Sequence, residues 1–323
     1  MSRTIAVADI GGTHARFAMA EVADRRVVSL GEPVTLRTAD HASLEMAWEE
    51  FGHQAATELP DALGMAFAGP VDGDLLKLTN NPWVIRPALM EEQLGVRQHM
   101  IINDLGAIAH AVAAFGDENF EHLTGPEGPL PVEGVTSVLG PGTGLGVAQL
   151  LKTAEGYHVV ETEGGHVDFA PLDAFEDEIL NYLRVGLNRV SVERIASGQG
   201  LVNLYKAVSA IEGKAVEDYD ASALWAAALE GSVPLATAAL DRFFLSLGAV
   251  AGDIALVQGA NAVVIAGGLG YRLKDRFATS GFAERFVAKG RFQRRMEEIP
   301  VKLANHPQPG LYGAAAAFAK EFA

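Results

Sequence analysis

The sequence contains no cysteine. This absence excludes disulfide bonds, metal sites built on thiolates and a cysteine nucleophile. It also excludes a small secreted scaffold held together by disulfides.

Long apolar runs are absent as well. The four residues Met1-Ser2-Arg3-Thr4 lead directly into a short apolar segment, residues 5–10, and no signal-peptide core follows. No apolar stretch reaches the length that spans a bilayer without an interrupting glycine or charge. We therefore expect a soluble cytoplasmic protein with no membrane partner.

Basic residues are scarce. The chain has 25 Lys and Arg against 41 Asp and Glu, which gives a formal net charge of −16. A surface this acidic repels phosphate polymers, so we expect no nucleic-acid partner. If the ligand is a polyphosphate nucleotide, its charge must be met mainly by backbone N–H groups and a divalent cation.

The apolar pattern favours an α/β fold. A hydrophobic fraction of 49% and a charged fraction of 20% are ordinary for a globular protein, and 323 residues suffice for two domains that share a cleft. Continuous apolar runs are typical of strands that are covered on both faces, so we expect strands there. Apolar residues spaced three or four apart predict the helices between them. The expected strands include residues 5–10, 15–19, 27–30, 62–68, 99–102, 135–139, 147–151 and 262–266, and the expected helices include residues 43–51, 107–115, 174–187, 200–211, 234–258 and 310–318.

One hairpin pattern occurs twice. Residues 5–19 and residues 135–151 each consist of an apolar strand, a turn with Gly and Thr, and a second apolar strand. We interpret this as a weak internal repeat of two similar α/β halves. The predicted division lies near residues 105–115, with a smaller domain over 1–110 and a larger domain over 111–309. The terminal helix, about 310–323, is expected to pack back on the smaller domain.

Three glycine-rich turns each follow a buried strand. They lie at residues 9–13, 140–144 and 267–268. Glycines let the backbone approach a phosphate closely and leave N–H groups aimed into the concavity, and Thr13 and Thr143 each add a hydroxyl. The chain has no P-loop string, and no turn matches the Gly-x-Gly-x-x-Gly pattern that opens a helix in dinucleotide-binding proteins. We therefore expect a nucleotide-phosphate site of another type.

Two carboxylates end predicted strands. Asp9, beside the first turn, either binds Mg²⁺ through water or closes the turn by accepting backbone N–H groups. Asp104 follows the strand 99–102, where a charged residue is costly unless it lies in a cleft or is paired. It serves either as a general base that takes a proton from a substrate hydroxyl, such as that of a sugar, or as a cap of the following helix. Asn103, beside it, can hydrogen-bond such a substrate.

Residues 161–166, Glu-Thr-Glu-Gly-Gly-His, place two carboxylates and a histidine around a pair of glycines. The spacing matches no zinc pattern such as His-Glu-x-x-His, so metal binding is disfavoured. A loop that binds a polyol fits better, because Glu163 accepts from hydroxyls and neutral His166 both donates and accepts. Glu193 is, from its neighbours alone, more simply a surface ion pair with Arg194.

Taken together, these motifs resemble those of the bacterial glucokinases in the actin-like sugar kinase superfamily. The resemblance spans the whole chain, and the segment 163–171 is specific to this branch. It rests on residues 8–13 (Ala-Asp-Ile-Gly-Gly-Thr), 78–83 (Leu-Thr-Asn-Asn-Pro-Trp), 101–104 (Ile-Ile-Asn-Asp), 139–146 (Leu-Gly-Pro-Gly-Thr-Gly-Leu-Gly), 163–171 (Glu-Gly-Gly-His-Val-Asp-Phe-Ala-Pro) and 193–198 (Glu-Arg-Ile-Ala-Ser-Gly).

The resemblance implies a two-domain actin-like ATPase (hexokinase-like) fold with ATP and glucose bound in an interdomain cleft that closes on the substrate. It implies that Asp104 is the general base and that Mg²⁺ accompanies the nucleotide. The implied glucose ligands are Asn103, Asp104, Glu163, His166 and Glu193. The implied nucleotide contacts are Ala8, Asp9, Ile10, Gly11, Gly12, Thr13, Gly142, Thr143 and Gly144, with Gly267 and Gly268 on the adenosine side.

The same resemblance suggests a homodimer without structural metal. The neighbouring repressor/kinase branch carries a Cys-rich zinc loop after its Glu-x-Gly-His segment, which a chain without cysteine cannot form. That branch's repressors also carry a helix-turn-helix arm ahead of the first glycine turn. Here the turn starts at residue 9, so we expect no such arm. The expected activity is transfer of the ATP γ-phosphoryl group to the 6-hydroxyl of D-glucose. The alternatives are a kinase for another hexose and a non-catalytic sugar-sensing regulator.

Overall fold

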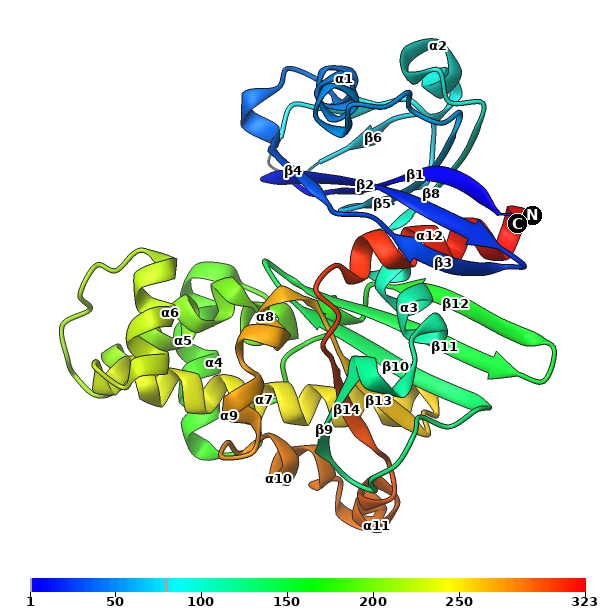
Figure 1. Cartoon of the computed structure of the whole chain (residues 1–323). Helices are drawn as coiled ribbons and strands as arrows, with labels where there is room; N and C mark the ends of the chain where they lie inside the picture. The colour runs from blue at the N-terminus through cyan, green and yellow to red at the C-terminus, as the bar shows by residue number, and fades with distance from the viewer. Residues whose placement is uncertain (1, 79–80) are drawn as a thin grey trace. The chain divides into compact units, whose positions relative to one another are not determined.

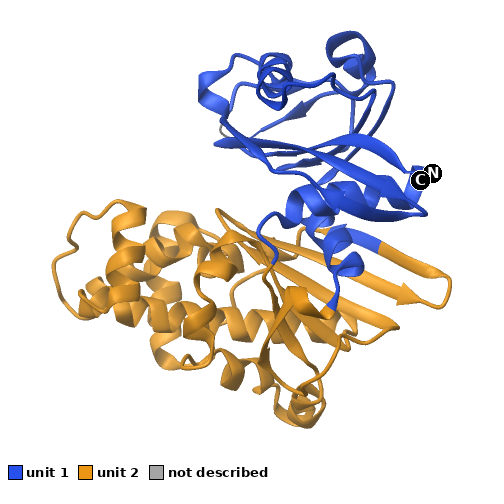
Figure 2. Ribbon diagram, viewed as in Figure 1, with its two compact units in different colours: residues 1–116, 159–161, 306–323 blue, residues 117–158, 162–305 orange. Residues whose placement is uncertain are grey.

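The computed structural model describes residues 2–78 and 81–323 (Figure 1). The chain divides into two compact units, coloured separately in Figure 2. Unit 1 contains residues 1–116, 159–161 and 306–323, and unit 2 contains residues 117–158 and 162–305. Unit 1 is therefore assembled from three separate segments of the chain. Of the segment 78–83 noted above, Thr79 and Asn80 lie outside the described residues.

Unit 1 is built on a six-stranded sheet. Its strands are β1 (Arg3–Ile10), β2 (His14–Ala23), β3 (Arg26–Leu30), β4 (Val34–Arg37), β5 (Ala62–Phe67) and β8 (Gln98–Asn103). The order is β3-β2-β1-β5-β8, with β4 paired to β2. β1 and β8 both run parallel to β5, and β2 runs antiparallel to β1. The ends of β1 and β8 therefore lie at the same edge of the sheet, because parallel strands finish on one side.

The two faces of this sheet are covered by different helices, because successive side chains of a strand point to opposite faces. Ala6, Ala8 and Ile10 of β1 pack in one cluster with residues of α1 (Leu44–Ala55) and α2 (Met90–Leu94). Ile5 and Val7 pack in another with α3 (Asp104–Ala114) and α12 (Pro309–Phe322). The remaining elements are η1 (Thr38–Asp40), η2 (Pro87–Leu89) and the ribbon of β6 (Leu76–Lys77) and β7 (Val84–Ile85).

Helix α12 lies unusually close to its neighbours. A Cβ added at Gly313 would come within 1.7 Å of the Ala107 carbonyl oxygen in α3, and one at Gly64 within 2.6 Å of the Ala314 carbonyl oxygen. Only glycine at these two positions lets the backbones approach so closely. The C-terminal helix is thus an integral layer of unit 1.

Unit 2 contains a second six-stranded sheet. Its order is β12-β11-β10-β13-β14-β9, formed by β9 (Phe120–Thr124), β10 (Gly134–Pro141), β11 (Leu145–Thr153), β12 (Gly156–Thr162), β13 (Ala262–Ile265) and β14 (Val301–Ala304). β10 and β11 form an antiparallel hairpin, and β13 runs parallel to β10, as β5 does to β1. The predicted repeat of the hairpin is confirmed.

Helices form the rest of unit 2. The longest, α7 (Pro234–Gln258), runs through the large apolar cluster of this unit. The others are η3 (Asp117–Asn119), η4 (Gly164–His166), α4 (Ala174–Leu187), η5 (Val192–Arg194), α5 (Gly198–Ile211), α6 (Ala221–Glu230), α8 (Gly267–Arg272), α9 (Lys274–Phe277), α10 (Phe282–Val287), η6 (Gly290–Phe292) and α11 (Gln293–Glu297). Among the residues that the structure describes, no helix combines the length and the apolar character needed to cross a membrane.

The predicted elements and the structure differ at one informative point. The helix expected to begin near Ala107 begins at Asp104. The Asn103 side chain accepts from the N–H groups of Leu105 (2.9 Å) and Gly106 (3.2 Å), which starts the helix one turn earlier.

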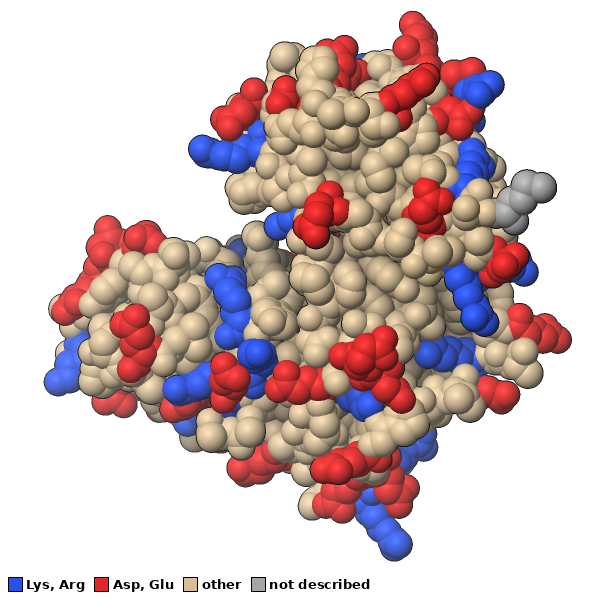
Figure 3. Space-filling model, in the orientation of Figure 1, with Lys and Arg blue, Asp and Glu red and all other residues tan. Residues whose placement is uncertain are grey.

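Charged side chains are spread over the surface. On the face drawn in Figure 3, Asp and Glu outnumber Lys and Arg, and both kinds are interspersed. The chain's acidic excess is therefore not gathered in a single patch on that face.

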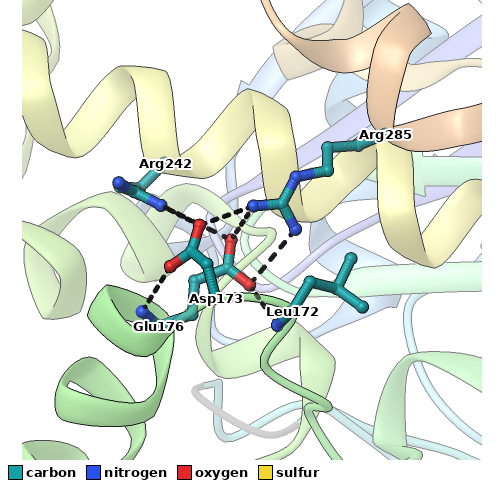
Figure 4. Close-up of polar contacts among 5 residues, drawn as sticks. All are labelled: Leu172, Asp173, Glu176, Arg242 and Arg285. Atoms are coloured by element: carbon teal, nitrogen blue, oxygen red, sulfur yellow. Dashed lines mark hydrogen bonds and ion pairs between the residues drawn. The ribbon is translucent and has the colours of Figure 1, made fainter. Parts of the chain in front are cut away.

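One partly buried cluster of charges lies in unit 2 (Figure 4). Asp173 caps α4 by accepting from the Glu176 N–H (2.9 Å), and Glu176 accepts from the Leu172 N–H (2.7 Å). Arg242 of α7 and Arg285 of α10 both lie 2.7 Å from Asp173 Oδ2. Arg285 also lies 3.2 Å from Glu176 Oε1, whose side chain is only 2% exposed. The cluster ties three helices together at the C-terminal end of the 163–171 segment.

We predict that Arg285→Ala destabilises the protein by about 3 kcal/mol, because it leaves the buried Glu176 carboxylate without its nearer cation. Thermal unfolding followed by circular dichroism measures the effect. Arg294→Ala, which removes an exposed arginine of α11, is the matched control. A melting temperature lowered equally little in both variants would contradict the prediction.

Candidate active site

The first candidate segment is the turn that joins β1 to β2. The Thr38 side chain donates to the Gly12 carbonyl (2.8 Å), and the Thr38 N–H donates to the Thr13 carbonyl (3.1 Å). The Gly11 N–H donates to the His14 carbonyl (2.9 Å). A Cβ at Gly12 would meet nothing within 4 Å. The turn is therefore fixed by its hydrogen bonds to Thr38, while the space beside the Gly12 Cα is open.

Asp9 stands one residue before the end of β1 and faces Arg16 across the hairpin. The antiparallel register pairs the two residues, and Arg16 Nη1 lies 3.3 Å from Asp9 Oδ2. Burial raises the pKa of the Asp9 carboxyl, while Arg16 lowers it. A Cβ at Gly310 would come within 2.9 Å of this carboxyl group, so glycine lets the start of α12 approach it. Arg16 and Gly310 are neighbours of Asp9 that the sequence analysis missed.

Asp104 is the first residue of α3, directly after β8. Its Oδ1 accepts from the Leu105 N–H (2.9 Å), and its carboxyl is partly buried. Burial, the charge of Asp9 and, to a smaller extent, the charge of Glu161 raise the pKa of Asp104 to about 6. The sequence alone allowed Asp104 to be the cap of the helix, whereas in the structure the N-cap is Asn103. A carboxylate with a pKa near neutrality is a common feature of catalytic sites.

Asn103 is held by several hydrogen bonds within unit 1. In addition to capping α3, its Nδ2 donates to the Gly69 carbonyl (3.3 Å), and its own N–H donates to Glu161 Oε1 (2.9 Å). Nδ2 carries two hydrogens, so the amide retains the capacity to donate once more. Glu161 was named in the sequence only as part of the Glu-Thr-Glu string, and its contact with Asn103 was not foreseen.

The turn of the second hairpin, Gly142 to Gly144, is fixed by main-chain hydrogen bonds within unit 2. The Gly142 N–H donates to the Gly144 carbonyl (2.8 Å), and the Gly198 N–H donates to the Gly142 carbonyl (2.7 Å). Gly267, with φ +85°, begins α8 beside this turn, because β13 pairs in parallel with β10. A Cβ at either Gly142 or Gly268 would meet nothing within 4 Å. The structure therefore brings the second and third glycine turns together at one edge of the sheet in unit 2.

Glu193 lies in η5 and reaches the same turn. Its Oε2 accepts from the Leu145 N–H (3.1 Å), and a Cβ at Gly144 would come within 2.3 Å of that oxygen. An ion pair with Arg194, the simpler alternative from the sequence, is not among the ion pairs of the described residues. The glycine in the turn thus makes room for an oriented carboxylate.

Glu163 is the N-cap of η4 and His166 is its last residue, and η4 packs against β11. A Cβ at Gly165 would come within 1.8 Å of the Leu145 carbonyl oxygen, so the Gly-Gly pair brings this loop onto the strand. His166 Nε2 lies 3.7 Å from Glu163 Oε2, and the two side chains are 55% and 77% exposed. Two polar side chains with acceptor and donor capacity are thus presented side by side to solvent.

Known proteins resemble this chain over almost its full length. The Glucokinase family model matches residues 6–321. Glucokinase of Zymomonas mobilis subsp. mobilis is 58% identical over 318 residues, which cover 98% of each chain.

Solved structures agree with this similarity. A glucokinase from an Antarctic psychrotroph is 33% identical and superposes with a TM-score of 0.84, covering 97% of this chain and 98% of its own. A ROK family glucokinase from Streptomyces griseus, solved with glucose and AMPPNP, has the same fold at 20% identity, with a TM-score of 0.61 and 98% and 99% coverage. The fold is that of the actin-like ATPases, as expected from the sequence. By both its sequence and its fold, this chain belongs to the glucokinase family.

Proposed function

We propose that this protein is a glucokinase that transfers the γ-phosphoryl group of ATP to the 6-hydroxyl of D-glucose, giving glucose 6-phosphate and ADP. Membership of the family supports an ATP-dependent hexose kinase. The observation that carries the proposal is Asp104, a partly buried carboxyl at the end of β8 whose pKa is raised to about 6.

Asp104 acts as the general base. A sugar hydroxyl becomes a competent nucleophile as its proton is removed, and a base is most effective when its pKa lies near the working pH. With a pKa of about 6, the carboxylate is ionised at pH 7 and is still more basic than an ordinary aspartate. The hydrogen bond from Leu105 fixes one carboxylate oxygen, so the side chain is oriented before the substrate arrives.

The glucose hydroxyls bind to Asn103, Glu163, His166 and Glu193. Two features support this assignment. The exposed pair of Glu163 and His166 offers acceptors and a donor, and Glu193 is oriented by its bond to the Leu145 N–H. Asn103 contributes its second amide hydrogen. A site that hydrogen-bonds each hydroxyl rejects epimers steeply, because an unmatched polar group is left without a partner.

The nucleotide phosphates bind at the glycine turns, along Ala8 to Thr13 and Gly142 to Gly144, with Gly267 and Gly268 on the adenosine side. At Gly12, Gly142 and Gly268 the space that a Cβ would enter is open, so a ligand can reach the backbone there. Main-chain N–H groups can cradle phosphate without adding positive side chains. This suits a chain with 25 basic residues against 41 acidic ones.

Asp9 fits a water-mediated contact to Mg²⁺. Among residues 2–78 and 81–323, no group of three or more His, Asp and Glu could by itself hold a metal ion. Mg²⁺ commonly binds through one carboxylate, several waters and the substrate phosphates, and Asp9 supplies such a carboxylate beside the first turn. When bound with the nucleotide, the ion would neutralise charge on the phosphates.

The finer features of the proposal follow the family resemblance. The two compact units are the two domains of the kinase, the protein is a cytoplasmic homodimer, and its product enters glycolysis. We also propose that the protein binds neither nucleic acid nor membranes, because its acidic surface repels both kinds of polyanion.

We predict that Asp104→Asn lowers kcat for glucose by 10²-fold to 10⁴-fold, the usual contribution of a general base. A coupled assay of ADP formation measures kcat, and calorimetric titration tests that glucose still binds. Asp241→Asn, which changes an exposed residue of α7, is the matched control. Near-normal turnover by Asp104→Asn would contradict the assignment of Asp104 as the general base. If the wild-type protein phosphorylates another hexose in preference to glucose, the substrate assignment is wrong.

The raised pKa of Asp104 predicts the pH dependence. Protonated Asp104 cannot accept the proton, so kcat/KM for glucose should fall about tenfold per pH unit below a midpoint of about 6. Asp9→Asn removes a negative charge that raises this pKa, so it should move the midpoint to lower pH, whatever it does to the plateau rate. A midpoint that stays in place in Asp9→Asn would contradict the electrostatic explanation.

The pH dependence of protein stability provides an independent check on the raised pKa of Asp104. The pKa of Asp104 in the folded protein is above the ordinary value of 3.8, so the folded state binds this proton more tightly than the unfolded state. The carboxyl group therefore costs stability at neutral pH, and the cost disappears as the pH falls below about 4. We expect Asp104→Asn to melt above wild type at pH 7.5 and at a similar temperature at pH 4. A lower melting temperature at pH 7.5 would contradict this sign.

A further inference from the structure

The segment that joins α4 to η5 contains a strained turn. Asn188 has φ +56° and ψ −58°, and the Arg189 N–H donates to the Leu187 carbonyl (2.6 Å). These dihedral angles and this bond define a classic γ-turn, which is rare and strained for a residue with a side chain. Such conformations persist where the surrounding structure requires them, and they concentrate at functional sites.

The turn directs Arg189 onto the loop that carries Glu163 and His166. Arg189 Nε lies 2.6 Å from Asp168 Oδ1, and its Nη2 donates to the His166 carbonyl (2.5 Å). One edge of the guanidinium group thus holds both a carboxylate and a main-chain oxygen of that loop. A lysine could not make both contacts, because its ammonium group is a point charge without this fork geometry.

The same two segments are also joined through their backbones. The Phe169 N–H donates to the Val190 carbonyl (2.9 Å), and the Val192 N–H donates to the Val167 carbonyl (2.9 Å). Asp168 and Ser191 form an isolated antiparallel bridge. His166 lies just before this short ribbon on one side, and Glu193 lies just after it on the other. The ribbon therefore links two of the proposed sugar ligands.

Apolar packing supports only one face of the ribbon. Phe169, Val190 and Val192 are buried in the large apolar cluster of unit 2, whereas Val167 is 48% exposed. Residues 167–170 and Val192 line a hollow of about 390 Å³, including the solvent at its mouth. The far end of the loop is fixed by the Asp173–Glu176 cluster of Figure 4. Between η4 and that cluster, Arg189 reaches the loop from outside with two polar contacts.

We propose that Arg189, aimed by the strained turn at Asn188, is a positioning residue that sets the orientation of His166 and Glu163 relative to Glu193. Its contacts are to Asp168 and to the main chain of His166, so it acts through the loop. The inference rests on the proposed function, because it assumes that these three residues bind the sugar.

We predict that Arg189→Ala raises KM for glucose about threefold to tenfold, with kcat changed less than twofold and KM for ATP unchanged. The effect is modest because both ion-pair partners are largely exposed. Arg189→Lys should retain most of the defect, since it keeps the charge and loses the fork. The matched control is Arg184→Ala, which removes an exposed arginine of the last turn of α4 and should leave KM for glucose at the wild-type value.

Two substitutions at Asn188 test the turn itself. Asn188→Gly keeps a residue that adopts positive φ and should preserve KM for glucose. Asn188→Val places a β-branched residue at φ +56° and should raise KM as Arg189→Ala does. A raised KM in Asn188→Gly together with an unchanged KM in Asn188→Val would show that the turn does not aim Arg189.

Hydrogen exchange of residues 163–168, measured by mass spectrometry without substrate, separates this inference from the proposed function. It should be faster in Arg189→Ala than in wild type and unchanged in Arg184→Ala. In an enzyme that phosphorylates glucose, either an unchanged exchange rate or an unchanged KM overturns the inference. If wild type does not phosphorylate glucose, the proposed function fails, and the exchange rate alone decides whether Arg189 holds the loop.

Discussion

Parallel strand pairing is the constraint on which the candidate site depends. β1, β5 and β8 run in one direction, so Asp9, the first glycine turn and Asn103-Asp104 finish at one edge of a sheet. β10 and β13 run parallel in the other unit and bring the turn 142–144 next to Gly267. In each unit, residues far apart in the chain become neighbours because strands of similar length end together. Ligands of open α/β sheets commonly bind beyond the carboxyl ends of the strands, for the same reason.

The electrostatics at this edge follow from the position of each group. Asp9 and Asp104 both sit where burial disfavours a negative charge, and both have a raised pKa. Arg16 moderates the effect at Asp9, whereas Asp104 feels the additional negative charges of Asp9 and Glu161. The two carboxyl groups are thus made chemically different by their neighbours, which is how one site supports separate tasks for identical side chains.

Much of the fold could be predicted from the sequence, because apolar runs and helical spacing are local signals. The helices over 174–187 and 234–258 begin and end where the pattern predicted. The Asp9–Arg16 pair could also have been found, since both residues lie symmetrically about the first turn of a hairpin. The start of α3 was misplaced because one side chain, Asn103, captures the first N–H groups of the helix. Glu161 and Arg189 carried no local signal, because their contacts join segments separated by 20 residues or more.

The three-segment construction of unit 1 has a consequence for how the protein is made. The apolar face of its sheet formed by Ile5, Val7, Ala18 and Ala62 is covered by α12, which is synthesised long after these strands. Before α12 is made, this sheet can form its strands, but α3 covers only part of that side. The nascent chain therefore exposes an aggregation-prone surface until the 14-residue helix α12 has been made and covers it.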